Sequence, residues 1–212
     1  MSNKTHRIFF DLDFTLYDTV ALMDDLRRNL ERFGASRSAI DAGFDQLNES
    51  GYSLENHLTL LLCPERLIPE RVLELQYHLS HGKKYLMPGV FDGLVGLADN
   101  CDIHLLTFGF PQYQRSKFAG LQEIAGIFRD SHFVWKDEKK GDVIRGFGSD
   151  VVTWFLDDSP AHLEDACQKA PWVKAVRMMW PEFKLKPDNR DHIHWDVVRS
   201  FDEFVALVKR GG

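Results

Sequence analysis

The sequence has few features that would place it in a specialised class of protein. Its 212 residues include only three cysteines, Cys63, Cys101 and Cys167, and no pair of them has CxxC spacing. A sparse, odd set of cysteines predicts reduced thiols and a cytoplasmic location rather than a disulfide-stabilised secreted protein. Glycine and proline number 15 and 8, and these ordinary counts exclude a collagen-like or low-complexity chain.

Long apolar runs and an excess of positive charge are also missing. The longest apolar stretches, such as Leu58–Leu62, are far shorter than the roughly 20 residues of a membrane span. The first seven residues lead into a run that contains Asp11 and Asp13, so we expect no signal peptide. Lysine and arginine number 26 against 32 acidic residues, a net charge of −6. We therefore expect neither a membrane nor a nucleic acid as a partner, while the oligomeric state is left open.

The sequence does contain short apolar runs that alternate with helical patterns. The runs are typical of buried parallel strands and lie at Arg7–Leu12, Ile103–Thr107, His132–Trp135, Val151–Leu156 and Val173–Met178. Helical patterns alternate with the later runs, the first of them just before Ile103–Thr107, and lie at Val90–Ala98, Gln112–Leu121, Glu138–Phe147, Pro160–Lys169 and Phe201–Lys209. This alternation predicts an α/β fold with a doubly wound, mostly parallel sheet.

The stretch between the first two apolar runs reads differently. It contains four amphipathic helical segments and no strand pattern, and the segments are Val20–Phe33, Ser36–Leu47, Ser53–Leu62 and Pro69–His81. We therefore predict an α/β core domain formed by residues 1–17 and 85–212. Residues 18–84 are predicted to form an inserted all-helical domain that covers the core as a lid.

Polar residues stand where three of the apolar runs end. The set comprises Asp11, Asp13 and Thr15 after the first run, Thr107 and Gly109 at the second, and Asp157 and Asp158 at the fourth. Because the carboxyl ends of parallel strands meet at one edge of a sheet, we expect these side chains to converge. Two unit charges about 4 Å apart repel by roughly 4 kcal/mol at an effective dielectric constant of 20. Several carboxylates there predict a hard cation, and oxygen ligands favour Mg²⁺.

A basic cluster, Lys136, Lys139 and Lys140, follows the third run. An ammonium group, a threonine hydroxyl and loop amides together suit an anionic substrate group. Combined with Mg²⁺ and carboxylates, they favour phosphoryl transfer.

The segment Asp11-Leu12-Asp13-Phe14-Thr15-Leu16 resembles the first motif of the haloacid dehalogenase-like (HAD) superfamily. Further elements follow in that family's order: Leu105–Gly109, a lysine, and Phe155–Asp158. Tyr85–Gly89 resembles the family's return to its core, so the resemblance spans the whole chain. It implies a HAD core with an inserted helical cap.

The resemblance also implies roles for individual residues. Asp11 would attack phosphorus and form an aspartyl phosphate, and Asp13 would act as general acid and then as general base. Thr107 and a lysine would stabilise the phosphoryl oxygens. Mg²⁺ would bind the Asp11 carboxylate, the Asp13 backbone carbonyl and Asp158, with Asp157 binding directly or through water. The remaining residues implied on the substrate side are Leu12, Thr15, Phe108, Gly109 and Lys139.

Lys140, followed by Gly141, resembles the family's lysine at the start of a helix, and we place it first. Lys136 and Lys139 remain alternatives. The cap residues Tyr52, Asn56 and His57 and the segment Gly82–Tyr85 are candidates for lining the substrate site.

The leading hypothesis is a Mg²⁺-dependent phosphatase of the HAD superfamily acting on a small soluble phosphate monoester, such as a nucleotide or a sugar phosphate. Dehalogenases of the superfamily lack the second aspartate, so Asp13 favours a phosphorylated substrate. A phosphomutase would share every motif. A non-hydrolytic phospho-acceptor or binding protein is the alternative from outside the enzymes.

Overall fold

The computed structural model describes residues 4–62 and 68–211. Cys63 lies outside the described residues, whereas Cys101 and Cys167 are free thiols. Within the described ranges, no helix combines the length and the apolar character needed to cross a membrane.

A six-stranded sheet forms the centre of the molecule, and every neighbouring pair of strands is parallel. The strand order is β3-β2-β1-β4-β5-β6. The bounds are β1 His6–Phe10, β2 Cys101–Phe108, β3 Asp130–Val134, β4 Val152–Asp157, β5 Lys174–Met178 and β6 Asp196–Val198. The predicted doubly wound parallel sheet is confirmed. The three-residue strand β6 was not predicted, because three residues are too few to make an apolar run.

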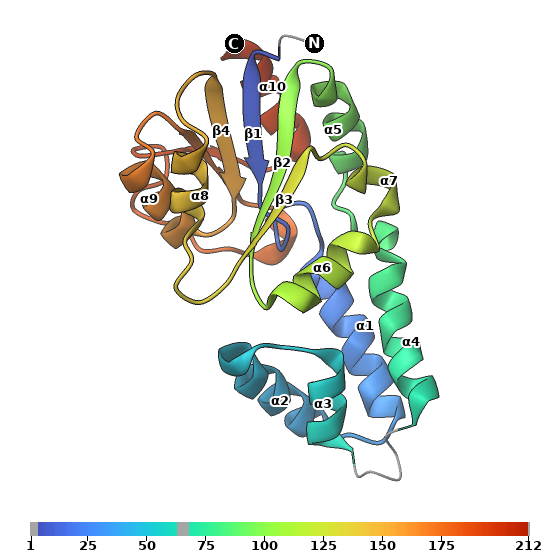
Figure 1. Ribbon diagram of the computed structural model, residues 1–212. Coiled ribbons are helices and arrows are strands. Elements are labelled where there is room, and N and C mark those ends of the chain that lie inside the picture. Colours follow the sequence, from blue (N-terminus) through green and yellow to red (C-terminus); the bar gives the residue numbers. More distant parts are fainter. Residues whose placement is uncertain (1–3, 63–67, 212) are drawn as a thin grey trace.

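Helices cover both faces of the sheet (Figure 1). Ile8 and Phe10 of β1 pack in one core with α5 (Val90–Ala98) and α10 (Phe201–Arg210). The intervening Phe9 packs on the other face, in a core shared with Ile144 of α8 (Lys140–Gly146) and Leu163 of α9 (Pro160–Lys169). Burial on both faces explains why β1 reads as a continuous apolar run.

The helical unit, which we define as α1 to α4, follows β1 directly. Its helices are α1 Thr19–Arg32, α2 Arg37–Ser50, α3 Leu54–Leu61 and α4 Pro69–Ser80. In Figure 1, α1 and α4 lie side by side and carry α2 and α3 away from the sheet, beyond the carboxyl end of β1. Tyr52 and His57, expected to line a substrate site, are buried in this unit, and His57 contacts the Tyr52 hydroxyl and the Ile40 carbonyl.

The two chain segments that join the helical unit to the sheet are hydrogen-bonded to each other. The Asp18 amide donates to the Tyr85 carbonyl at 2.7 Å, and the Met87 amide donates to the Leu16 carbonyl at 3.0 Å. The returning segment is the 3₁₀ helix η2 (Gly82–Tyr85). Its Gly82 amide donates to the carbonyl of Gly120, which follows α6 (Pro111–Ala119). The helical unit is therefore tied to α6 as well as to β1.

Gly120 allows this junction to form, because a Cβ atom there would lie 1.6 Å from the Leu79 carbonyl oxygen. We expect Gly120→Ala to lower the free energy of unfolding by about 1–3 kcal/mol through steric overlap. Gly126→Ala is the matched control, since Gly126 also ends a short helix, α7 (Gln122–Ala125), and has nothing within 4 Å of an added Cβ. Urea denaturation of both variants measures the difference, and equal stabilities would contradict the steric account.

Candidate active site

Acidic residues from two neighbouring strands meet at the carboxyl edge of the sheet. Asp11 follows β1, and Asp157 is the last residue of β4. Phe10 pairs with Leu156, and the Asp11 amide donates to the Leu156 carbonyl at 3.0 Å, so the two aspartates are placed side by side. One carboxylate oxygen from each of Asp11, Asp157 and Asp158 lies within 4.8 Å of the other two. The structure thus brings together three of the four acids expected to converge.

Lys140 is the lysine that reaches these acids. It is the first residue of α8, its side chain is 1% exposed, and its Nζ donates to Asp11 Oδ1 and Asp157 Oδ2, both at 2.6 Å. Lys136 and Lys139 are exposed. Gly141 lets α8 begin close to α9, because an added Cβ would lie 2.5 Å from the Asp165 carbonyl oxygen. The geometry supports Lys140 as the motif lysine.

The cluster gathers acidic groups that are largely removed from water, since Asp11 and Asp157 are buried and Asp158 is partly buried. Burial raises the pKa of Asp11 to about 6, and burial reinforced by the charges of Asp157 and Asp11 raises the pKa of Asp158 to about 8. Burial also disfavours the charge on Asp157, but the Lys140 ammonium more than offsets it and holds that pKa below its ordinary value. If all three carboxyl groups ionise beside one ammonium, two negative charges remain, and the raised pKa values of Asp11 and Asp158 reflect the cost of that charge, which one divalent cation would balance. Oxygen ligands alone suit Mg²⁺ or Ca²⁺.

The oxygens of Asp157 both accept hydrogen bonds. Oδ1 accepts from the Ser159 amide at 2.8 Å, and Oδ2 accepts from Lys140. The Asp158 backbone is fixed separately, because its carbonyl accepts from Arg177 Nε at 3.1 Å. Asp157 is thus bound to the protein through both oxygens.

The carboxylate of Asp13 is bound by a different set of donors. Lys117 Nζ lies 2.6 Å from Oδ1 and 2.5 Å from Oδ2, and Gln114 Nε2 donates to Oδ2 at 2.8 Å. The hydroxyl of Thr19, the first residue of α1, donates to Oδ1. Although burial acts in the opposite direction, Lys117 lowers the pKa of Asp13. Sequence reasoning missed these three donors; the signal was the i,i+3 spacing of Gln114 and Lys117 on the helix after the second strand.

Two buried hydroxyls near the ends of β1 and β2 have no hydrogen-bond partner among the described residues. Thr107 and Thr15 are both 0% exposed, and their Oγ1 atoms make no hydrogen bond within the described part of the chain. A buried hydroxyl without a partner is uncommon and indicates a site for a ligand or water. Both fit the expected contacts to an anionic group.

The loop after β2 is held by hydrogen bonds within the protein. Gly109 has φ 145°, and its amide donates to the Val134 carbonyl at 3.0 Å. Gly109 also leaves room for Gln114, whose Nε2 would lie 2.4 Å from an added Cβ. The Phe108 carbonyl accepts from the same Gln114 amide. Leu12 is buried, and its carbonyl accepts from the Leu16 amide in the turn after β1.

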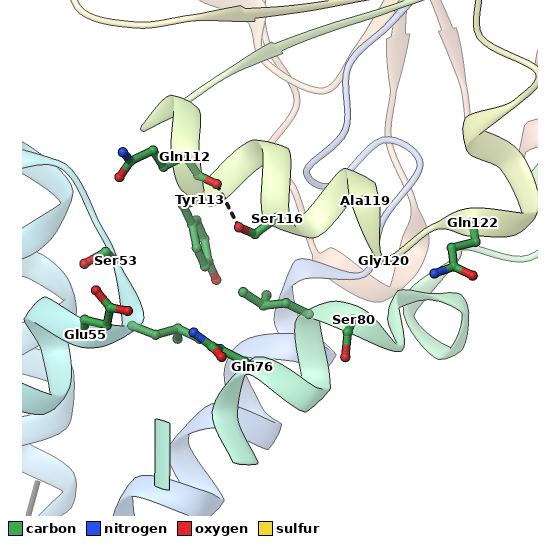
Figure 2. A pocket seen from close by; sticks show the side chains of 12 residues that line it. Ser53, Glu55, Gln76, Ser80, Gln112, Tyr113, Ser116, Ala119, Gly120 and Gln122 are labelled. Atoms are coloured by element: carbon green, nitrogen blue, oxygen red, sulfur yellow. Dashed lines mark hydrogen bonds between the residues drawn. The ribbon is translucent and has the colours of Figure 1, made fainter. Parts of the chain in front are cut away.

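A pocket of about 490 Å³ lies between the helical unit and α6 (Figure 2). Tyr113 and Gln112 project into it from α6, facing Glu55 of α3 and Gln76 of α4. Among the described residues that line the pocket, Glu55 is the one with a charged side chain. The remaining lining residues are Ser53, Leu54, Leu79, Ser80, Ser116, Ala119, Gly120 and Gln122. Gln114 and Lys117 use another side of the same helix to bind Asp13.

Solved structures with a similar fold cover nearly the whole chain. A haloacid dehalogenase-like family hydrolase from Xanthomonas campestris aligns with a TM-score of 0.66 at 14% identity, over 99% of this chain and 93% of that one. A proposed HAD hydrolase from Bacillus subtilis, bound to magnesium, aligns with a TM-score of 0.63 at 16% identity, over 97% and 99% of the two chains. A proposed β-phosphoglucomutase from Thermotoga maritima gives 0.62 at 19% identity, over 97% and 99%.

The chain has the haloacid dehalogenase-like fold. This confirms, at the level of the fold, the resemblance seen in the motifs. No family model matches the sequence, and no curated protein matches it. The residues expected from the HAD motifs stand at the ends of β1, β2 and β4 and at the start of α8, where the acid cluster lies.

We expect a divalent cation to stabilise the protein through this acid cluster. Binding to the folded state stabilises it by about 2.7 kcal/mol at a hundred times the dissociation constant, so the thermal midpoint should rise as MgCl₂ is added. In Asp158→Asn, the same rise in the thermal midpoint should need at least roughly tenfold more Mg²⁺, because one charged ligand is lost. Asp99→Asn, at an exposed position after α5, is the control. Identical Mg²⁺ titrations for the two variants would exclude Asp158 as a ligand.

Proposed function

We propose that the protein is a Mg²⁺-dependent phosphatase that hydrolyses a small phosphate monoester, with Asp11 as the residue that is transiently phosphorylated. The observation that carries this proposal is the contact of one buried lysine with two aspartates from adjacent strands, beside a third. Lys140 forms an ion pair with Asp11, and the Asp11 carboxylate is also one of the three carboxylates that could bind a divalent cation. The proposal extends what the HAD resemblance implies to the contacts seen in this chain.

The chain's own groups supply most of the chemistry in this proposal. An Asp11 oxygen attacks phosphorus, and the bond from phosphorus to the leaving oxygen breaks. Asp13 takes up a proton from solvent before the first step and gives it to the leaving oxygen, and it then takes one from the water that hydrolyses the aspartyl phosphate. The Thr107 and Thr15 hydroxyls donate to phosphoryl oxygens, and Lys140 offsets the negative charge of the phosphoryl group and Asp11.

The metal would be held by the carboxylates of Asp11 and Asp158 and by the backbone carbonyl of Asp13. Because both Asp157 oxygens already accept hydrogen bonds, Asp157 is proposed to act through water. When bound, the ion would reduce the repulsion between the anionic phosphate and the anionic nucleophile. The magnesium bound to the Bacillus subtilis protein of the same fold supports this choice of ion.

The substrate is proposed to be small, such as a nucleoside monophosphate or a sugar phosphate. The helical unit stands beyond the carboxyl end of β1, where it would act as a cap that excludes bulky substrates (Figure 1). Asp13 favours a phosphate ester over a halide, because halide leaves without a proton. A phosphomutase is the second candidate, supported by the similar fold of the Thermotoga maritima protein. Its activity would transfer the phosphoryl group to a sugar phosphate and release no inorganic phosphate.

The sparse thiols, two of them free, support a cytoplasmic location in this proposal.

Replacement of the nucleophile tests the mechanism. We expect Asp11→Asn to lose at least roughly 10⁴-fold in kcat for phosphate release from aryl, nucleoside and sugar phosphates. Acid-quenched wild-type protein should carry one phosphoryl group that the variant lacks. Asp196→Asn, at an exposed position in β6, is the control. A fully active Asp11→Asn variant would exclude the covalent mechanism.

A second prediction separates Lys140 from Lys136. Lys140→Met should reduce kcat by about 10²–10³-fold, because the ammonium that faces Asp11 and the phosphoryl group is removed. Lys136→Met should stay within about twofold of the wild type, since Lys136 is exposed. The measurement is steady-state phosphate release with Mg²⁺, after a melting curve has shown that each variant is folded. The reverse order of activities would assign the motif role to Lys136.

A further inference from the structure

Lys117 is a second buried lysine at the site, and no motif quoted above contains it. Its side chain is 2% exposed, and its Nζ is within 2.6 Å of both oxygens of Asp13. Asp13 is its ion-pair partner among the described residues. The ammonium also lies over the ring of Tyr113, 4.9 Å from its centroid. The Lys117 ammonium thus contacts one carboxylate, that of Asp13, and the ring of Tyr113.

A buried ion pair such as Lys117–Asp13 contributes little to the stability of the folded state. Removing a lysine and a carboxylate from water has an energetic cost that their attraction often only balances, and apolar residues of similar volume are frequently as stable or more so. The pair does restrict geometry. A carboxylate with both oxygens on one ammonium, and further donors in Gln114 and Thr19, has little freedom to rotate.

The donors come from two parts of the molecule. Thr19 begins α1 of the helical unit, whereas Gln114 and Lys117 belong to α6, which packs against β2 and β3. α6 also contacts α4 of the helical unit. Lys117 therefore links Asp13 to the sheet through α6, whereas Thr19 links it to the start of α1.

We propose that Lys117 is a positioning residue for Asp13, which fixes the orientation of its carboxylate for proton transfer to the leaving oxygen. This inference rests on the phosphatase function proposed above, in which Asp13 is the general acid. It assigns Lys117 to the leaving-group half of the reaction, in contrast to Lys140, which faces the nucleophile. Removal of Lys117 should therefore lower kcat most for substrates whose leaving group must be protonated.

The experiment measures kcat and KM with Mg²⁺ for a series of phosphate monoesters, from 4-nitrophenyl phosphate through phenyl phosphate to an alkyl phosphate. General acid catalysis contributes about 10²–10⁴-fold. Lys117→Met is expected to lose about 10²-fold in kcat on the alkyl phosphate but only a few-fold on 4-nitrophenyl phosphate, whose phenolate leaves without protonation. KM should change little. Lys117→Arg should recover part of the loss, because guanidinium can also bind both oxygens.

Two further variants make the result specific. Asp13→Asn should show the same dependence on the leaving group, and Lys117→Met in the Asp13→Asn background should have no additional effect. Arg115→Met, at an exposed position on α6, should leave the whole series unchanged. Urea denaturation of the single and double variants measures the coupling of the pair in the absence of substrate.

The outcomes separate the inference from the proposed function. If Asp13→Asn depends on the leaving group while Lys117→Met loses activity equally on all esters, the phosphatase proposal stands and the positioning role is wrong. If neither variant depends on the leaving group, although Asp11→Asn is inactive, the acid role of Asp13 falls and the inference with it. A wild-type protein inactive on every ester overturns both, and a coupling in stability would then make Lys117 a structural partner only.

Discussion

The structure depends on how negative charge is accommodated at the carboxyl edge of the sheet. Four aspartates follow two adjacent strands, and burial disfavours the ionised form of each. Two buried lysines offset part of this charge, and they arrive from opposite sides. Lys140 begins α8, which packs in the core on one face, and Lys117 lies on α6, whose Phe118 packs in the core on the other face. The doubly wound topology is what allows a cation to approach from each side.

The two lysines divide the four aspartates into functionally different groups. Asp13 and Asp157 each have both oxygens engaged by protein donors. Asp11 shares Lys140 with Asp157, and Asp158 keeps the most strongly raised carboxyl pKa of the cluster, about 8. Asp11 and Asp158 are therefore the two carboxyl groups whose ionised forms the protein stabilises least. In the proposed mechanism, these are the carboxylates that face the metal, and one of them is the nucleophile.

Much of this arrangement could be predicted from the sequence because it follows from strands. A buried strand produces an unbroken apolar run, so the positions of Asp11 and Asp157 at strand ends could be read directly. Lys140 could be placed first among three lysines from its position before Gly141, but its contact with both Asp11 and Asp157 could not be predicted, because that contact depends on how α8 begins against α9. Lys117 was missed for a similar reason. Its partner, Asp13, is 104 residues away in the chain, and a lysine within an amphipathic helix reads as solvent-exposed unless the tertiary contacts are known.

The helical unit contacts the site directly, through the hydrogen bond from Thr19 to Asp13. Thr19 is both the first residue of α1 and a donor to Asp13, and only five residues separate the two in the chain. The linkers beside it are hydrogen-bonded to each other, so α1 and η2 must move together if the helical unit moves. At Gly120, α4 and η2 contact the end of α6, the helix that carries Gln114 and Lys117. The helical unit is therefore connected to Asp13 both through Thr19 and through the helix that carries Lys117. Asp13 thus contacts α1 of the helical unit through Thr19 and α6 through Lys117 and Gln114, an arrangement suited to a group that acts when the substrate is enclosed.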